Sequence, residues 1–303
     1  MNELSFEGQV AVVTGAGRGL GRAYAHLLAG RGASVVVNDL GGSMGGTGTD
    51  AAPASGVATE ITSAGGSAVA DTSDVASVEG AETLIGAAIT RFGRIDVLVN
   101  NAGIMRWAGL PEADADNLAR HLAVHVGGSF NTVRAAWTHM VDQSYGRIVM
   151  TTSTGMFGLP DNISYAAAKG AVIGLARSLA TAGAAHGIRV NCIAPAAFTR
   201  MAGKTEGTAS ADTNPRAAQM GPELVSPMVG LLAHESCPVT GEVLVAGAGH
   251  FARLVLAVTE GYVHQGEPTI EDVSKHWAQI CDTGNLSVPT DLMDWSRGFL
   301  RHL

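Results

Sequence analysis

The chain is poor in cysteine, in basic residues and in long apolar runs, and each shortage excludes a class of protein. Its three cysteines among 303 residues lie far apart, so neither a disulfide framework nor a cysteine zinc site is predicted. Acidic residues outnumber basic ones by 27 to 19, which argues against nucleic acid as a partner. No apolar run approaches the ~20 residues that span a bilayer, and the N-terminus lacks a basic and then apolar signal. We therefore expect a cytoplasmic protein that does not bind membranes.

Apolar residues are abundant at 46%, and they fall into short runs separated by stretches of helical periodicity. Strands are predicted at Gln9–Val13, Ser34–Asp39, Ala68–Asp71, Val97–Asn100, Arg147–Thr151, Arg189–Ile193 and Val243–Ala246. Helices are predicted at Leu20–Ala29, where Gly30 and Gly32 are candidate C-caps, at Ala115–Val141 and at Ser164–His186. Apolar strands that alternate with helices indicate a parallel sheet covered on both faces, so residues 1–249 are expected to form one α/β domain.

Two segments depart from this alternation. Leu40–Pro53 is a glycine-rich insertion after the second strand. Residues 250–303 form a C-terminal extension that we expect to pack on the same domain or on a partner subunit. It holds a predicted helix at Thr269–Ile280, capped by Thr269, and irregular structure after Cys281.

The sequence Thr14-Gly-Ala-Gly-Arg-Gly-Leu-Gly21 lies between the first strand and the first helix. Glycines there let a pyrophosphate approach the helix N-terminus, although such a turn can also be purely structural. Asp39 follows Gly15 by 24 residues and ends the second strand. Its carboxylate can bind the adenosine ribose hydroxyls and repel a 2′-phosphate, which favours NAD over NADP. The alternative is that Asp39 only starts a turn.

Tyr165 and Lys169 are four residues apart, on one face of a predicted helix. A phenol has a pKa of ~10, and a nearby cation is expected to lower that pKa. Such a tyrosine can exchange a proton with an alcohol oxygen. Ser153 precedes Tyr165 by 12 residues and follows a strand, where it could bind the same oxygen.

Taken together, the glycine turn, Asn100-Asn101-Ala102-Gly103, the serine and YxxxK resemble the short-chain dehydrogenase/reductase family. The resemblance implies a Rossmann-type doubly wound domain with a seven-stranded parallel sheet. It implies Tyr165 as proton donor and acceptor, Ser153 as carbonyl ligand, and Lys169 as ligand of the ribose hydroxyls and modulator of the Tyr165 pKa. The cofactor contacts that it implies are Gly15, Arg18, Gly19, Leu20, Gly21, Asp39, Asp74, Val75, Asn101, Ala102, Gly103, Tyr165, Lys169 and Thr199. For Asn101 the alternative is an amide that only ties neighbouring strands together.

Within that family the chain shows a closer resemblance to the (3R)-hydroxyacyl-CoA dehydrogenase units of peroxisomal multifunctional enzymes type 2. The segments that carry this similarity include Val37–Gly42, Tyr145–Met150, His234–Cys237 and Trp277–Asp282. The similarity implies an acyl-CoA substrate, NAD as oxidant and a homodimer, with a homotetramer as the other family arrangement. His125 stands where most family members carry an active-site asparagine; it could hold a proton-relay water or be a packed helix histidine.

The substrate loop is expected at Met201–Gln219. No metal site is expected, because His121, His125 and His139 share a helical stretch without the spacing of metal ligands. The alcohol could be a 3-hydroxyacyl thioester, or a steroid or other bulky alcohol. Two alternatives remain: an NADPH-preferring carbonyl reductase, against which Asp39 argues, and a non-catalytic NAD-binding protein. The intact Ser153, Tyr165 and Lys169 argue against the second alternative.

Overall fold

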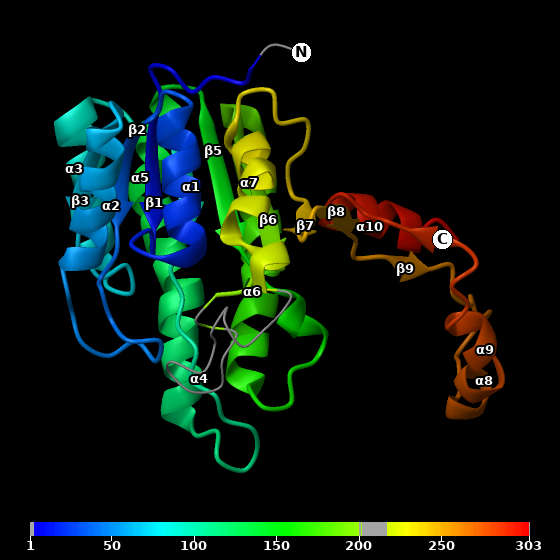
Figure 1. Cartoon of the computed structure of the whole chain (residues 1–303). Coiled ribbons are helices and arrows are strands. Elements are labelled where there is room, and N and C mark those ends of the chain that lie inside the picture. The colour runs from blue at the N-terminus through cyan, green and yellow to red at the C-terminus, as the bar shows by residue number, and fades with distance from the viewer. Residues whose placement is uncertain (1–2, 200, 202–216, 303) are drawn as a thin grey trace. The chain divides into compact units, whose positions relative to one another are not determined.

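The computed structural model describes residues 3–199, 201 and 217–302 of the chain (Figure 1). The chain divides into two compact units, Met1–Arg253 and Leu254–Leu303. The predicted domain boundary, after residue 249, lies close to the end of the first unit at Arg253.

The first unit contains an eight-stranded sheet with the order β3-β2-β1-β4-β5-β6-β7-β8. Its first seven strands are parallel to one another. They are β1 (Val10–Thr14), β2 (Ser34–Asn38), β3 (Ser67–Asp71), β4 (Val97–Asn100), β5 (Gly146–Thr151), β6 (Ile188–Pro195) and β7 (Val243–Gly247). All seven were predicted, and the Rossmann-type fold is confirmed.

The eighth strand, β8 (His250–Leu254), corrects the predicted strand number. It follows β7 through Ala248 and Gly249, whose φ angles of 50° and 75° are those of a tight hairpin turn. A connection of two residues joins antiparallel strands, because a parallel pair needs a crossover of a dozen or more residues. The start of the C-terminal extension therefore belongs to the edge of the sheet.

Helices cover both faces of this sheet (Figure 1). On one face α1 (Gly19–Gly30) packs between α2 (Ala52–Ser63) and α7 (Ser226–Ala233). Their apolar side chains share one core with the valines of β1, β2 and β4. On the other face α3 (Val78–Phe92) packs against α5 (Gly128–Asp142). Strands buried on both sides explain why their sequences are apolar throughout rather than alternating.

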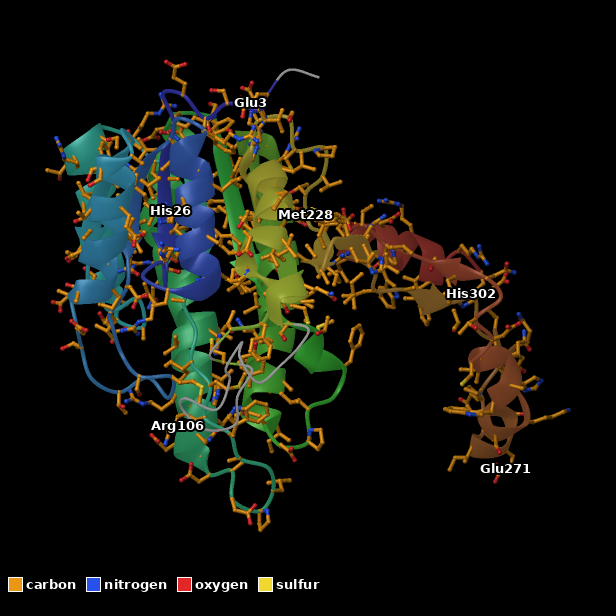
Figure 2. The ribbon with its side chains drawn as sticks, viewed as in Figure 1. Glu3, His26, Arg106, Met228, Glu271 and His302 are labelled. Carbon is orange, nitrogen blue, oxygen red and sulfur yellow. The ribbon has the colours of Figure 1, made fainter. Side chains whose placement is uncertain are left out.

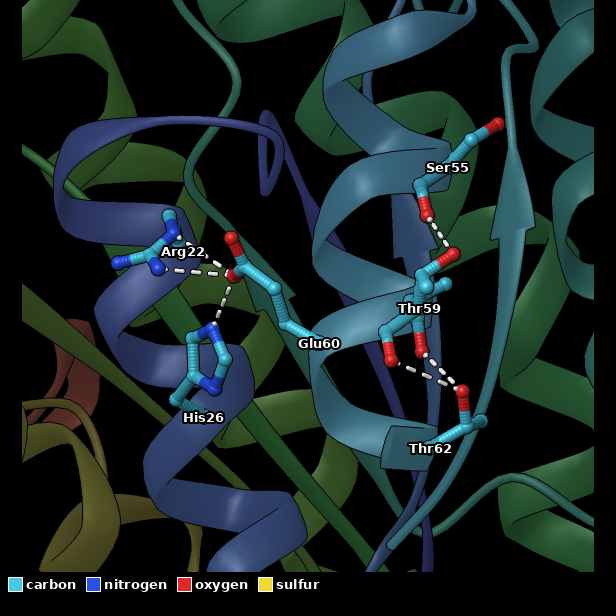
Figure 3. Close-up of polar contacts among 7 residues, drawn as sticks. Arg22, His26, Ser55, Thr59, Glu60 and Thr62 are labelled. Carbon is cyan, nitrogen blue, oxygen red and sulfur yellow. Dashed lines mark hydrogen bonds and ion pairs between the residues drawn. The ribbon is translucent and has the colours of Figure 1, made fainter. Parts of the chain in front are cut away.

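An exposed ion cluster joins α1 to α2 (Figure 3). Glu60 Oε2 accepts hydrogen bonds from Arg22 Nη2 at 2.8 Å and Nε at 3.1 Å, and it lies 2.9 Å from His26 Nε2. Both partners lower the pKa of Glu60, with the His26 hydrogen bond contributing most. Its exposure makes the cluster a weak contributor to stability.

The helical stretch predicted at Ala115–Val141 is continuous but not uniform. It runs through α4 (Ala115–His121), a π-helical segment η1 (Leu122–Gly127) and then α5. π-Helical turns occur frequently at functional sites. The next predicted helix is α6 (Ile163–Gly183), followed by a 3₁₀ turn, η3, that ends at His186.

Helix α1 ends differently from the prediction for one of its two candidate caps. Gly30 is the last helical residue, and Arg31 is the C-cap. Gly32 follows with φ +99°, the conformation that glycine adopts most readily after a helix. The prediction of Gly30 as a C-cap was therefore wrong, whereas Gly32 does lie in the turn that ends the helix.

The second unit is small. Its strands β9 (Val258–Thr259) and β10 (Leu286–Ser287) pair antiparallel. Thr269 caps α8 (Ile270–Lys275) as predicted, but the predicted helix divides at His276 before α9 (Trp277–Ile280). The irregular structure predicted after Cys281 was wrong in part, because Asp291 caps a further helix, α10 (Leu292–Phe299). Among the described helices, none is long and apolar enough to cross a membrane.

Candidate active site

A cleft of about 340 Å³ opens at the carboxyl ends of the central strands. Strand β1 lies between β2 and β4. The chain leads from β1 to β2 and from β4 to β5, so the two connections run toward opposite edges of the sheet. Ligands of open α/β sheets bind at such a point. Most of the predicted cofactor residues line this cleft: Gly15, Arg18, Gly19, Leu20, Asp39, Asp74, Val75, Asn101, Ala102, Gly103 and Thr199.

The glycine turn fits a bound pyrophosphate. Gly15 has φ +61°, and a Cβ there would lie 2.8 Å from Ala102 Cα. A Cβ at Gly21 would overlap the Gly15 carbonyl, which places Gly21 behind the cleft instead of in its wall. No side chain in the described part of the chain caps α1 at Arg18, so the first N–H groups of the helix are available to an anion.

Asp39 both starts a turn and faces the cleft. Its Oδ2 accepts a hydrogen bond of 2.9 Å from Gly17 N, and its Oδ1 accepts one of 2.7 Å from Gly41 N. Each carboxylate oxygen has a second lone pair, so Asp39 can still accept hydrogen bonds from a ribose. The two interpretations of Asp39 are thus compatible.

Asn101 ties the central strands together, as its alternative interpretation predicted. Its Nδ2 donates to the carbonyls of Thr14 at 2.9 Å and Gly15 at 3.1 Å. Thr14 Oγ1 in turn accepts hydrogen bonds from the backbone N–H groups of Asn101 and Ala102, both at 3.0 Å. These four bonds hold the glycine turn against the segment that follows β4, and thereby shape the floor of the cleft.

The YxxxK pair lies on α6, behind the end of β5. Asn162 Oδ1 accepts a hydrogen bond from Tyr165 N and caps the helix at this point. Lys169 is buried, and its Nζ donates a 2.7 Å hydrogen bond to the Thr151 carbonyl. Its Nζ also lies 5.7 Å from the centroid of the Tyr165 ring. Ser153 lies just past β5, and the interaction of its side chain with Tyr165 acts to lower the pKa of the phenol.

The electrostatics of this pair differ from the prediction. Burial raises the pKa of Tyr165, and the hydrogen bond with Ser153 offsets this only in part. Burial also lowers the pKa of Lys169 to about 7. The pKa of Tyr165 is therefore not lowered as expected, because the effect of burial outweighs that of the hydrogen bond with Ser153.

Two buried histidines contact the ring of Tyr165. His121 and His125 stack with centroids 5.9 Å apart, and each meets Tyr165 edge to face, at 6.2 and 5.4 Å. Sequence reasoning had weighed the spacing of these histidines only for metal binding, although four residues along a helical stretch also let both rings face one neighbour. Burial lowers the pKa of both rings, His125 well below its usual range, so neutral imidazoles surround the phenol. His125 is a packed helix histidine here, and the proton-relay water stays a prediction.

Sequence reasoning missed a part of the cleft wall. Its further lining residues include Asn38, Leu40, Gly42, Ser43, Gly46, Ser73, Ala76, Ile104, Arg120, Ala123, Val124 and Met201. Several of them belong to the glycine-rich insertion, which had been given no role. Most of the substrate loop expected at Met201–Gln219 lies outside the described residues.

Comparisons with known proteins show the family of the chain. The family model described as short chain dehydrogenase matches residues 9–209. Peroxisomal multifunctional enzyme type 2 of Mus musculus is 43% identical over 307 residues, which cover 99% of this chain and 40% of the mouse protein. The structure of the full-length Drosophila melanogaster enzyme of that name has a TM-score of 0.80 at 34% identity, over 99% of this chain and 50% of the fly chain. A short chain dehydrogenase from Mycobacterium avium has a TM-score of 0.75 at 36% identity, over 91% of this chain and 95% of that chain.

This chain thus spans half or less of each multifunctional enzyme and nearly the whole mycobacterial one. The family match covers more than half of the chain and includes the glycine turn, Ser153 and the YxxxK pair. The protein is therefore an oxidoreductase of the short-chain dehydrogenase family.

Proposed function

We propose that the protein oxidises a secondary alcohol to a ketone with NAD, and that the alcohol is a (3R)-3-hydroxyacyl thioester of coenzyme A. The observation that carries the proposal is the geometry of one cleft. In this cleft Asp39 lies beside the glycine turn, and Gly103 lies against a residue that contacts Tyr165. A Cβ at Gly103 would lie 2.5 Å from His125 Cε1, and His125 contacts Tyr165. The similarity to the dehydrogenase units of the multifunctional enzymes supports the acyl thioester.

The residues of the cleft suit a dinucleotide. The N-terminus of α1 and the glycine turn would hold its pyrophosphate, and Asp39 would accept hydrogen bonds from the adenosine ribose. Asp74 and Val75 line the cleft where adenine would lie. When bound, NAD supplies the acceptor for the hydride that leaves the carbinol carbon.

The reaction also releases the hydroxyl proton of the alcohol. The Tyr165 phenolate would take this proton while Ser153 holds the same oxygen, so the alcohol loses one hydride and one proton and becomes a ketone. Because burial raises the pKa of Tyr165, its phenol stays protonated at neutral pH in the structure. This protonation state suits the reverse reaction, in which Tyr165 donates the proton to a carbonyl oxygen.

A turnover panel tests this function. NAD and NADP would each be offered with 3-hydroxyacyl-CoAs of graded chain length and with cyclic secondary alcohols. We expect saturable NADH formation with the (3R)-thioesters and much weaker use of NADP. Preferential turnover with NADPH and a ketone would favour the carbonyl reductase alternative. Binding of NAD without turnover of any compound would favour the non-catalytic alternative and overturn the proposal.

We also propose a homodimer or homotetramer. Helix α6 carries Gly170 and Gly174, and a Cβ at either position would meet no atom within 4 Å. Small residues on an open helix face allow a second copy to approach closely. Light scattering after size exclusion would test this state, and a monomer at micromolar concentration would contradict it.

A further inference from the structure

The glycine-rich insertion forms an ordered loop whose ends and tip are closed by its own backbone. Asp50 N donates to the Leu40 carbonyl at 2.9 Å. At the tip, Ser43 N donates to the Thr47 carbonyl at 2.8 Å, and their hydroxyls lie 2.8 Å apart. Gly46 N closes the turn on the Ser43 carbonyl at 3.0 Å. Such internal bonds order residues 40–50, of which Leu40, Gly42, Ser43 and Gly46 line the cleft.

The tip of this loop contacts the chain just after β4. Met105 N donates a 2.8 Å hydrogen bond to the Met44 carbonyl, and both methionine side chains are buried. Gly46 packs so closely on Ile104 that a Cβ there would lie 2.7 Å from Ile104 Cγ2. The loop therefore supports the segment Ile104–Arg106 from the side of the cofactor cleft.

The two buried histidines hold the same segment from its other side. His125 Nε2 lies 2.9 Å from the Ile104 carbonyl oxygen and 3.3 Å from Ile104 N. Arg106 N donates to His121 Nε2 at 3.3 Å. These are the imidazoles that meet the Tyr165 ring edge to face. Movement of Ile104 would consequently be passed to a ring that touches Tyr165.

A third side chain makes a parallel connection. Asn162 Nδ2 donates to Met105 Sδ at 3.0 Å, while its Oδ1 accepts from Tyr165 N at 3.2 Å. The backbone and the ring of Tyr165 are thus both held by groups that also hold Ile104–Arg106. Of the other groups near the phenol, Ser153 follows β5 and Lys169 lies on α6, so neither belongs to the loop.

We propose that the glycine-rich loop of residues 40–50 positions Tyr165 for proton transfer, acting through Ile104–Arg106 and the two histidines. This inference rests on the proposed role of Tyr165 as acid and base. It gives the insertion a task in the chemistry as well as in the cofactor cleft. Proton transfer is sensitive to such support, because a misplacement of about 1 Å by a distant substitution can cost up to about 100-fold in rate.

Two glycines of the loop provide a matched pair for the test. Gly46 and Gly48 have φ angles of +80° and +79°, so alanine introduces the same backbone strain at either position. A Cβ at Gly48 meets nothing within 4 Å, whereas a Cβ at Gly46 must displace Ile104. We expect Gly46→Ala to lower kcat about tenfold and Gly48→Ala to keep kcat within about twofold of the parent.

A rescue variant isolates the contact. Ile104→Ala removes Cγ2 and Cδ1 and leaves only the Ile104 Cβ, 3.6 Å from the added methyl group. Gly46→Ala combined with Ile104→Ala should therefore have the kcat of Ile104→Ala alone. Independent, multiplicative losses in the double variant would contradict the proposal.

A readout without substrate separates this inference from the proposed function. The protein has four tyrosines, and in 3-fluorotyrosine-labelled protein the Tyr165 fluorine resonance is assigned by its loss in Tyr165→Phe. Gly46→Ala should shift that resonance, and Gly48→Ala should leave it in place. An unshifted resonance, or a raised KM for NAD with unchanged kcat, would show that the loop acts on the cofactor alone and would overturn the proposal. If the parent protein turns over no alcohol, the proposed function fails, and the resonance still decides the inference.

Discussion

The Nζ atom of Lys169 lies 5.7 Å from the centroid of the Tyr165 ring and donates its 2.7 Å hydrogen bond to a backbone carbonyl. Both side chains are desolvated, and burial moves their pKa values in opposite directions, upward for Tyr165 and down to about 7 for Lys169. Near neutral pH the phenol is therefore neutral and the amine only partly protonated, so the pair carries less charge than the sequence motif indicates. The pH dependence of stability and of rate follows from this relationship.

Lys169 should make stability depend on pH. Its pKa is about 7 in the folded protein and 10.5 ordinarily, so the unfolded chain binds more protons between these values. The free-energy cost of burying the charged Lys169 side chain is greatest below pH ~7. This cost shrinks as the pH rises, by at most about 1.4 kcal/mol per pH unit. Urea unfolding at pH 7 and 9 should show the wild type gaining stability relative to Lys169→Met. A difference between the two proteins that does not change with pH would contradict this pKa.

Tyr165 should make the oxidation rate rise with pH. In the proposed mechanism the phenolate is the base for oxidation, and a raised pKa leaves it scarce at neutral pH. We expect kcat/KM for the alcohol to increase about tenfold per pH unit up to the alkaline range, with no such increase for ketone reduction. A tenfold change per pH unit corresponds to ~1.4 kcal/mol. A profile for oxidation that is flat between pH 6 and 9 would argue against Tyr165 as the base.

Asp39→Ala should raise the use of NADP relative to NAD, because it removes the charge that repels a 2′-phosphate. It also leaves Gly17 N and Gly41 N without their acceptor, so absolute activity should fall with both cofactors. The measurement is therefore the ratio of kcat/KM for the two cofactors. Asp39→Asn is the control that keeps one oxygen acceptor and loses the charge. An unchanged NAD preference in both variants would rule out the ribose role.

Gly21→Ala should abolish NAD binding, whereas Gly30→Ala in the same helix should not. A Cβ at Gly21 would overlap the Gly15 carbonyl and lie 2.6 Å from Asn101 Nδ2, which would push the glycine turn away from β4. A Cβ at Gly30 meets nothing within 4 Å, and alanine there should leave stability unchanged or raise it by up to about 1 kcal/mol. Calorimetric titration with NAD compares the two, and equal affinities would contradict this account of the turn.

The central parallel strands were predictable because each is a short apolar run, as in Val35-Val36-Val37, that is buried on both faces of the sheet. Strand β8 was not, since its hairpin turn places Ala248 at φ 50°, where glycine or asparagine is the usual signal. The candidate catalytic residues Ser153, Tyr165 and Lys169 were predicted from their order along the chain. Two features arise between segments that are distant in the sequence: the contact of Gly46 with Ile104, and the burial that shifts the Tyr165 pKa. No local sequence pattern predicts either of them.

The central claim is that Tyr165 transfers the proton while NAD takes the hydride from a (3R)-3-hydroxyacyl-CoA. It is tested most directly by NADH formation from such a thioester in the wild type and in Tyr165→Phe, with NAD affinity measured for both. We predict turnover by the wild type, and a loss of about 100- to 10,000-fold in Tyr165→Phe without loss of NAD binding. Equal turnover by the two proteins, or none by a wild type that binds NAD, would contradict the account.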